Sequence, residues 1–349
     1  MNRIKTVQEH LNRWMLAYVS LAIVAGLVLG NAAAGWTKAN TGTVGTLTTV
    51  AVFLIIYPMM VSVRFEALLR AGRNLRGIGI ALALNFLWAP VFGWVLATVF
   101  LSDPLLALGF LLVMVVPCSS MAIGYTGLAK GDLELATVVV ALSFVLAIVA
   151  VPLWMTVFAS GYGIAVPMGD LIGSILTVLV APMVLGYVTR RGLMRWLGSA
   201  RFGAIAPLFP ALSLLGMYSI VFLIFFGKAG LILGQWQTVA ILLVPNAIFM
   251  GLTLLLVTWL DRRLGMGFEE HMAVAFTSTG KNNGTAIAIA TTAFSPMVAI
   301  PAATMPIFQI LLMVLYLRAA PRIRQWFSTR AAAGDALAPA PAGLAGGPR

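Results

Sequence analysis

Residues 104–129 read PLLALGFLLVMVVPCSSMAIGYTGLA, and residues 269–294 read EEHMAVAFTSTGKNNGTAIAIATTAF. Each stretch is long enough to cross a membrane as a helix, which takes about 20 apolar residues, yet each is polar at its centre. Pro117 lacks an N–H group and breaks the first helix, while glycines weaken the second helix on both sides of Lys281. Irregular backbone at membrane depth is tolerated only in a protein interior or around a wet cavity. The two interruptions therefore predict a binding site where the two helices meet.

The composition shows that these stretches belong to an integral membrane protein. Of the 349 residues, 61% are hydrophobic and only 9% are charged, whereas soluble domains have about 25% charged residues. The mean hydropathy is +1.01. Continuous rather than alternating apolar runs argue against a transmembrane β-barrel, and the single cysteine, Cys118, excludes a disulfide scaffold. We interpret the net charge of +12 as basic cytoplasmic loops and not as nucleic-acid binding.

Ten apolar stretches of spanning length predict an all-α membrane protein with ten transmembrane helices. The basic residues alternate between the intervening loops, with 19 on one side and only Lys38 and Lys228 on the other. This bias predicts a multi-pass protein of the plasma (inner) membrane with both termini in the cytoplasm. We expect the spans near residues 14–35, 43–63, 77–101, 104–129, 133–159, 168–189, 205–227, 236–260, 269–294 and 298–318.

The ten spans divide into two sets of five, within a single transporter unit at residues 1–327. The sets cover about residues 10–160 and 165–320. Because each set has an odd number of spans, the second set enters the membrane from the opposite side, which is the inverted repeat of secondary transporters. Residues 328–349 are rich in Ala, Pro and Gly and predict a disordered cytoplasmic tail.

Matching polar positions in the two sets support the repeat. Asn85 and Asn246 lie 161 residues apart, at equivalent depths of the third and eighth spans. The interruptions lie in the fourth and ninth spans, at equivalent places. We therefore expect helices 4 and 9 to be broken and to cross at the midplane, where their ends present N–H groups to anions and carbonyls to cations.

Polar residues at the crossing form the predicted substrate site. An ammonium at the centre of a span costs at least about 2.5–3.5 kcal/mol, so Lys281 must face a cavity, carbonyls, Asn side chains or a transported anion. Burial favours the neutral amine, so Lys281 is also the predicted coupling residue, able to carry a proton. Structural roles stay open: a buried thiol, a lysine bonded to broken-helix carbonyls, and amides that join helices. The predicted substrate-binding residues are Cys118, Ser119, Ser120, Lys281, Asn282, Asn283, Asn85 and Asn246, and the predicted helix-break residues are Pro117, Gly280 and Gly284.

The segment from Val116 to Asp132, VPCSSMAIGYTGLAKGD, resembles the fourth-span signature of the bile acid:sodium symporter superfamily, which includes the arsenical-resistance arsenite permeases. The likeness is closest in the final Leu-Ala-Lys-Gly-Asp and extends loosely over residues 10–320. It implies ten spans, with the fourth and ninth broken and crossing.

The resemblance implies different site chemistry for the two branches of the superfamily. The span-4 Ser and Asn that ligate sodium in the symporters correspond to Ala122 and Ile123, which offer no side-chain oxygen. Ser278 stands in place of the symporters' span-9 Glu, and Lys281 is a candidate for a built-in cation. Sodium coupling of the usual kind is therefore not expected.

The arsenite permeases share other residues with the chain. Cys118 matches their span-4 cysteine, and Asn282 and Asn283 match their Asn-Asn pair, while Thr285 replaces their Glu.

We expect a secondary transporter that works by alternating access, foremost an arsenite-type efflux permease. One thiol binds a soft trivalent arsenic centre and still releases it. The alternative is a bile-acid-symporter-like carrier of an organic anion paired with Lys281. We expect no enzyme, no metal site and no cofactor, because paired intramembrane acids and a His-Glu-x-x-His motif are missing. The expected partners are a small-molecule substrate (arsenite or a small anion) and the lipid bilayer, with no nucleic acid.

Glu269, Glu270 and His271 are expected at the cytoplasmic interface of the ninth span.

Overall fold

Helices make up almost all of the structure. The computed structural model describes residues 3–66, 74–164, 168–234 and 236–336. These residues contain no β-strand, and their one isolated bridge pairs Cys118 with Lys281. Arg70, Arg73 and Arg349, which belong to the predicted cytoplasmic charge, lie outside the described residues.

The helices follow one another with short connections. The first half of the chain contains α1 (Arg3–Arg13), α2 (Met15–Ala32), α3 (Ala34–Ala39), α4 (Thr41–Ser62), α5 (Leu75–Ala83), the π-helix η2 (Leu84–Trp88), α6 (Ala89–Phe100), α7 (Pro104–Val115), α8 (Met121–Leu128) and α9 (Leu133–Gly161). The second half contains α10 (Met168–Ile175), η3 (Leu176–Val180), α11 (Ala181–Ile205), α12 (Leu208–Gly227), α13 (Ala229–Gly234), α14 (Trp236–Ala240), α15 (Leu243–Arg263), α16 (Phe268–Thr279), α17 (Asn283–Ile289), η4 (Ala290–Phe294) and α18 (Ile300–Ala336).

Eight helical stretches in the described residues are long and apolar enough to cross a membrane. They are Met15–Ala32, Thr41–Ser62, Leu75–Phe100, Leu133–Gly161, Leu171–Ile205, Leu208–Gly227, Leu243–Arg263 and Ile300–Ser328. The other two predicted spans, 104–129 and 269–294, are each divided, so that α7 and α16 have only 12 residues apiece. The chain is therefore a multi-pass membrane protein.

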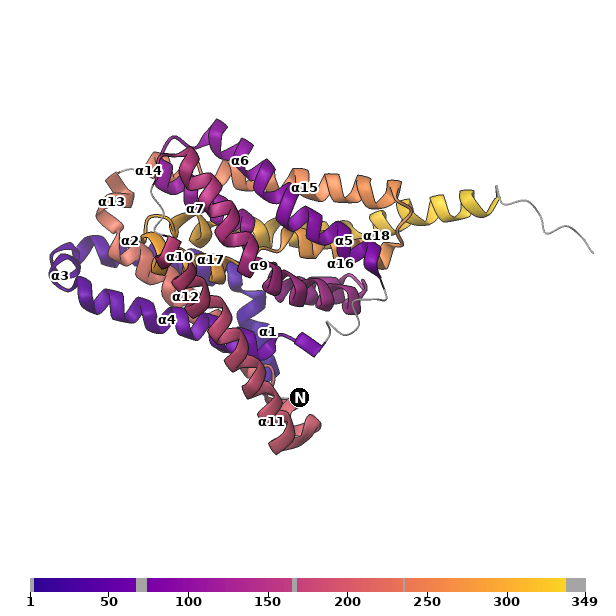
Figure 1. Ribbon diagram of the computed structural model, residues 1–349, viewed down its shortest axis with the longest axis horizontal. Coiled ribbons are helices and arrows are strands. Elements are labelled where there is room, and N and C mark those ends of the chain that lie inside the picture. Colours follow the sequence, from indigo (N-terminus) through magenta and orange to yellow (C-terminus); the bar gives the residue numbers. More distant parts are fainter. Residues whose placement is uncertain (1–2, 67–73, 165–167, 235, 337–349) are drawn as a thin grey trace, which may run out of the picture.

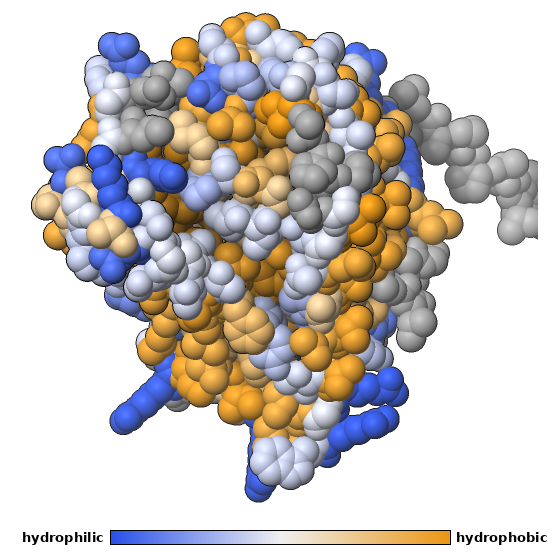
Figure 2. All heavy atoms as spheres, turned by 60° about the vertical axis from the view of Figure 1, so that its left-hand side comes forward, coloured by the Kyte–Doolittle hydropathy of each residue, from blue (hydrophilic) through white to orange (hydrophobic). Residues whose placement is uncertain are grey.

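The outer surface is apolar, as lipid contact requires. Leu21, Val28 and Val149 are each more than 60% exposed. In Figure 2, hydrophobic side chains form broad areas of the visible face, with weakly polar ones between them, and most of the strongly hydrophilic ones lie near its margins. A soluble protein rarely exposes a continuous apolar surface of this kind.

The helices pack as two groups. The first helix group comprises α1, α2, α4, α11 and α12, in which α12 packs against both α2 and α4. The second helix group comprises α5, α6, α7, α8, α9, α15, α16 and α18. Figure 1 shows α2, α4 and α12 together on the left and α5, α6, α15, α16 and α18 above them and to the right. Helix α17 contacts α4 of the first group and α7 and α18 of the second.

The last helix is longer than the sequence predicts. Helix α18 continues to Ala336, past the span end expected near residue 318 and past the start of the expected tail. Alanine-rich sequence after residue 330 favours continued helix. Residues 337–349 of the predicted tail lie outside the described residues.

Candidate functional site

Both predicted interruptions are present, and they contact each other directly. Helix α7 ends at Val115 before α8 begins, and α16 ends at Thr279 before α17 begins. The two connecting segments run antiparallel. The Ser119 N–H donates to the Gly280 carbonyl at 2.6 Å, and the Asn282 N–H donates to the Pro117 carbonyl at 3.0 Å. Each segment thereby satisfies backbone groups that the other helix leaves free. We call this pair of segments, residues 116–120 and 280–282, the crossing.

The two glycines of the second stretch have different roles. Gly280 ends α16, and a Cβ there would lie 2.7 Å from the Phe276 carbonyl oxygen and 2.9 Å from Met313 Cε. Gly284 lies inside α17 and does not break the helix, in contrast to the prediction. A Cβ at Gly284 would lie 2.5 Å from Ile55 Cγ2. A glycine is therefore needed at position 284 because α17 packs closely on α4.

Two predicted substrate residues start the second half-helices. The Asn282 Oδ1 accepts from the Thr285 N–H at 3.1 Å at the start of α17. The Ser119 Oγ accepts from the Met121 N–H at 3.2 Å at the start of α8. Each side chain thus satisfies a free N–H of the helix that it precedes.

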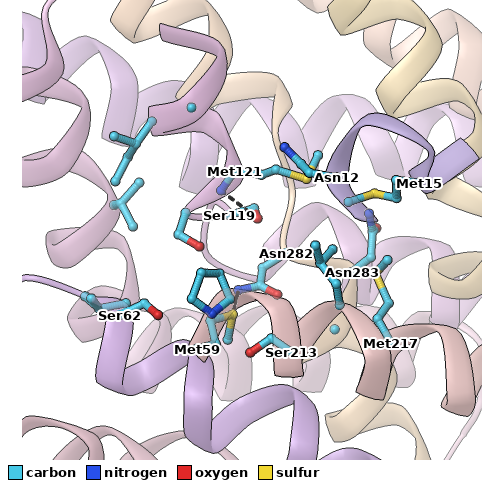
Figure 3. A pocket seen from close by; sticks show the side chains of 18 of the residues that line it. Asn12, Met15, Met59, Ser62, Ser119, Met121, Ser213, Met217, Asn282 and Asn283 are labelled. Atoms are coloured by element: carbon cyan, nitrogen blue, oxygen red, sulfur yellow. Dashed lines mark hydrogen bonds between the residues drawn. The ribbon is translucent and has the colours of Figure 1, made fainter. Parts of the chain in front are cut away.

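A cavity of about 530 Å³ lies against one face of the crossing, between the two helix groups. It extends from the crossing toward the end of the molecule that carries α1. Figure 3 shows labelled side chains from both groups around it. The first group contributes Asn12, Met15, Met59, Ser62, Ser213 and Met217, among others, and the second group and the crossing contribute Ser119, Ser120, Met121, Lys281, Asn282, Asn283 and Gln309.

An amide pair on the cavity wall is bonded to the crossing. The Asn283 Nδ2 donates to Gln309 Oε1 at 3.3 Å, and the Gln309 Nε2 donates to the Lys281 carbonyl at 3.1 Å. The Asn283 Oδ1 has no hydrogen-bond partner among the described residues, so it is an acceptor that a substrate can use. Gln309 is not among the predicted site residues, although it is the only amide in the predicted span 298–318.

Cys118 lies on the buried side of the crossing. Its side chain is fully buried, does not line the cavity, and places Sγ 3.2 Å from Ser143 Oγ. The Ser143 hydroxyl donates its hydrogen to the Val140 carbonyl at 2.7 Å. The contact between the two side chains therefore needs the thiol as donor, which means that Cys118 is protonated in this arrangement.

The ammonium of Lys281 is also on the buried side. Its Nζ donates to the Met114 carbonyl at 2.9 Å, to Asn85 Oδ1 at 3.0 Å and to the Asn85 carbonyl at 3.3 Å. Neither Asn85 nor Met114 lines the cavity. Asn246 is buried as well, but its amide has no partner among the described residues and does not line the cavity. The predicted residues that do line it are Ser119, Ser120, Lys281, Asn282 and Asn283.

His271, which is expected at the cytoplasmic interface, is fully buried inside the protein. Its Nδ1 lies 2.7 Å from Asp261 Oδ2, and its Nε2 lies 2.7 Å from the Tyr316 hydroxyl. The partners come from α15 and α18, which pack against the first turn of α16.

Long apolar helices in two groups, broken helices that cross, and a cavity between the groups define a membrane transporter. The sequence model of the Sodium Bile acid symporter family matches residues 49–235, more than half of the chain. The chain belongs to this family and is one of its membrane transporters. Its expected partners are accordingly a small-molecule substrate and the lipid bilayer.

Relatives with different names show similar sequence identity to this chain. The Arsenical-resistance protein Acr3 of Corynebacterium glutamicum is 24% identical over 82% of this chain and 80% of its own. The Acr3 protein of Alkaliphilus metalliredigens is 24% identical over 92% of this chain and 94% of its own. The uncharacterized sodium-dependent transporter YocS of Bacillus subtilis is 28% identical over 57% of this chain and 59% of its own.

Proposed function

We propose that the protein is a secondary transporter that works by alternating access and exports arsenite. The observation that carries the transport mechanism is the position of the cavity, between two helix groups and against the crossing. Relative movement of the two groups would close the cavity at one end and open it at the other. Substrate-binding roles are proposed for four of the predicted residues on its wall, Ser119, Ser120, Asn282 and Asn283. The fifth, Lys281, directs its Nζ at Asn85 and Met114.

The grouping of helices supports the proposed inverted repeat of ten spans. The first helix group takes the first two and the sixth and seventh predicted spans. The second takes the third to fifth and the eighth to tenth. Each half of the chain thus supplies the same members to each group, as a repeat requires. With both termini in the cytoplasm, the cavity in this structure opens inward, because Gln8, Asn12 and Arg64 line it.

The arsenite proposal rests on Cys118 and on the similarity to the two Acr3 proteins. Cys118 lies in the crossing itself, one residue before Ser119, which lines the cavity. Arsenic(III) is thiophilic, and one thiol allows release. Because the thiol faces Ser143 in this structure, the proposal requires the crossing to turn Cys118 toward the substrate during the cycle.

The test is arsenite export by cells and by everted membrane vesicles. Cys118→Ala should reduce resistance and uptake into everted vesicles to the level without the protein, with normal amounts in the membrane. Ser143→Ala is the matched control, because it removes the hydrogen-bond partner and keeps the thiol. Export should saturate and show counterflow, which a channel would not. Normal arsenite export by Cys118→Ala would contradict the proposal.

A second candidate substrate is an organic anion, which the cavity itself favours. A volume of about 530 Å³ lies in the range of pockets for drug-sized ligands, roughly 300–1,000 Å³, and is far larger than arsenite needs. Arg64 lines the cavity, and no carboxylate does among the described lining residues. The sequence pairs this anion with Lys281, but the Lys281 Nζ already donates to Asn85 and Met114, so we pair the anion with Arg64. In this case Arg64→Gln should abolish anion flux while Cys118→Ala leaves it intact, which is the reverse of the pattern for arsenite.

A further inference from the structure

Lys281 carries a fully buried ammonium whose hydrogen-bond partners are all neutral oxygens. Two are backbone carbonyls, of Asn85 and Met114, and one is the Asn85 side-chain oxygen. Sets of carbonyl and amide oxygens are the surroundings that proteins provide for hard cations. These oxygens can face a cation only if no helical N–H group occupies them.

A proline frees the Asn85 carbonyl. In η2 the Ala89 N–H donates to the Leu84 carbonyl, five residues back. The next N–H in that pattern would come from residue 90, which is Pro90 and has none. The helix thus offers the Asn85 carbonyl no donor. Isolated π-turns of this kind often occur at functional sites.

A second proline frees the Met114 carbonyl. It belongs to the last turn of α7, where carbonyls lack helical partners. The N–H three residues on would belong to Pro117, which has none. The N–H of Cys118 donates instead to Ser143 Oγ at 3.3 Å. The C-terminal end of α7, with its partial negative charge, is therefore directed at the ammonium.

The Asn85 side chain is held so that its oxygen faces Lys281. Its Nδ2 donates to the Ala81 carbonyl at 2.9 Å and to the Thr277 carbonyl at 3.0 Å. With both amide hydrogens used, Oδ1 points toward the ammonium. Because Thr277 belongs to α16, the same amide also joins η2 to the helix that leads to the crossing.

We propose that these oxygens form a monovalent-cation site that the chain fills with its own ammonium. The oxygens come from the third and fourth predicted spans, and the charge comes from the ninth. Lys281 then supplies the cation that would otherwise be taken from solution, and transport needs no sodium. Of the two coupling roles that the sequence leaves open, this one keeps the proton on Lys281. Only its consequence for transport rests on the proposed carrier function.

The test is to empty the site and refill it. Lys281→Ala removes the side chain beyond Cβ, and n-propylammonium replaces the removed atoms one for one. The thermal midpoint of the purified full-length variant is measured in chlorides of propylammonium, sodium and potassium. Tetramethylammonium, which has no N–H donors, serves as the ionic control at equal ionic strength.

We expect a saturable rise of the midpoint of Lys281→Ala with propylammonium, and a smaller rise with sodium or potassium, because a ligand that binds only the folded state stabilises it. The wild type should show no such difference between salts. Lys281→Met is the matched control, since its apolar chain fills the space and should abolish the selective shift. Equal shifts of Lys281→Ala in all four salts would overturn the proposal.

A second measurement decides the matter if Lys281→Ala does not fold. Asn85→Leu, Lys281→Met and the double variant form a mutant cycle. If the amide oxygen solvates the charge, Asn85→Leu should cost much less stability once the ammonium is gone. Additive effects would overturn the proposal.

Transport separates the two hypotheses. Wild-type counterflow of arsenite in proteoliposomes should be the same with and without sodium, and Lys281→Ala should require propylammonium or a metal cation. Sodium-dependent wild-type flux would overturn the inference. A wild type that moves no arsenite would contradict the proposed function, while the thermal measurements would still decide on the cation site.

Discussion

At its first turn, α16 buries His271 against Asp261 and Tyr316, and just beyond its last turn the chain buries Lys281 against Asn85 and Met114. Both clusters join α16 to neighbouring helices, and all their titratable groups except Tyr316 are fully buried. They differ in how the charge is compensated. One contains a carboxylate opposite a base, whereas the other offers a cation only neutral oxygens.

If all four contacts of the His271 cluster are hydrogen bonds, a count of hydrogens makes the cluster neutral overall. Four contacts connect Asp261 to His271, His271 to Tyr316, Tyr316 to Thr258, and Thr258 to the Leu254 carbonyl. Thr258, Tyr316 and a neutral His271 supply three hydrogens for these four contacts. The Asp261–His271 pair must therefore hold one more proton, so its charges cancel. The four contacts thus hold α16 against α15 and α18 without an added ion. We call this cluster the neutral clamp.

The Lys281 cluster has no such cancellation. Among the described residues, its positive charge is balanced only by the dipoles of carbonyls and of one amide. The stability of such a site depends on each oxygen and on the cation that occupies it. Helix α16 is therefore fixed by a neutral clamp at one end and by a replaceable charge at the other, next to the cavity.

The largest effect is expected for Asn85→Leu, which removes the amide from the uncompensated end. Breaking the surroundings of a buried charge costs about 3–5 kcal/mol of unfolding free energy. The matched control is Asn246→Leu, at the position of the eighth predicted span that the proposed repeat pairs with Asn85. Because the buried Asn246 amide has no partner among the described residues, its replacement should be neutral or stabilising. Unfolding in detergent, followed by circular dichroism, would compare the two.

Similar losses for the two asparagine variants would break the distinction between the clusters. They would mean that Asn85 contributes packing and not solvation of Lys281. A loss confined to Asn85→Leu would support the distinction between the clusters, since the two asparagines have the same chemistry and nearly the same burial, 0% and 1% exposed.

A smaller loss is expected for His271→Phe at the clamped end. The phenyl ring keeps the stacking on Phe327, whose ring centre lies 4.6 Å from that of His271. It leaves the Asp261 carboxyl buried without its base, which costs about 2 kcal/mol. The measurement is again the unfolding free energy. Adding Asp261→Leu should recover part of the loss, and failure to recover any would show that the pair is not the source of the stability.

The sequence predicts the crossing well because its causes are local. Pro117 breaks a helix wherever it is placed, and polar residues around Lys281 cannot lie in lipid. Both breaks are found where they are expected. Gly284 was misread because a glycine that permits close packing looks the same in a sequence as one that ends a helix. Only the approach of Ile55 distinguishes the two.

The orientation of side chains at the site could not be predicted. Cys118 and Lys281 belong to the same few residues as Ser119 and Asn283, yet the Cys118 side chain is buried against Ser143 and the Lys281 Nζ is bonded to Asn85. Backbone between two half-helices has no regular period from which to derive a face. The partners of these side chains come from other helices, and a single sequence does not reveal those contacts.

The smallest effect is expected for Tyr316→Phe, which removes one link of the clamp and leaves the ion pair in place. The lost hydroxyl contacts His271 Nε2 at 2.7 Å and Thr258 Oγ1 at 2.5 Å. We expect a loss of about 1 kcal/mol in unfolding free energy.

The chain has only two histidines, and His10 is exposed, so nitrogen NMR of histidine-labelled protein can observe His271 against an internal reference. In the wild type the spectrum should show a hydrogen on both ring nitrogens or one shared with Asp261. In Tyr316→Phe the Nε2 signal should change while Nδ1 stays bonded to the carboxylate. A neutral imidazole with a free Nε2 in the wild type would show that the four contacts are not all made, and α16 would then lack the neutral clamp that sets its two ends apart.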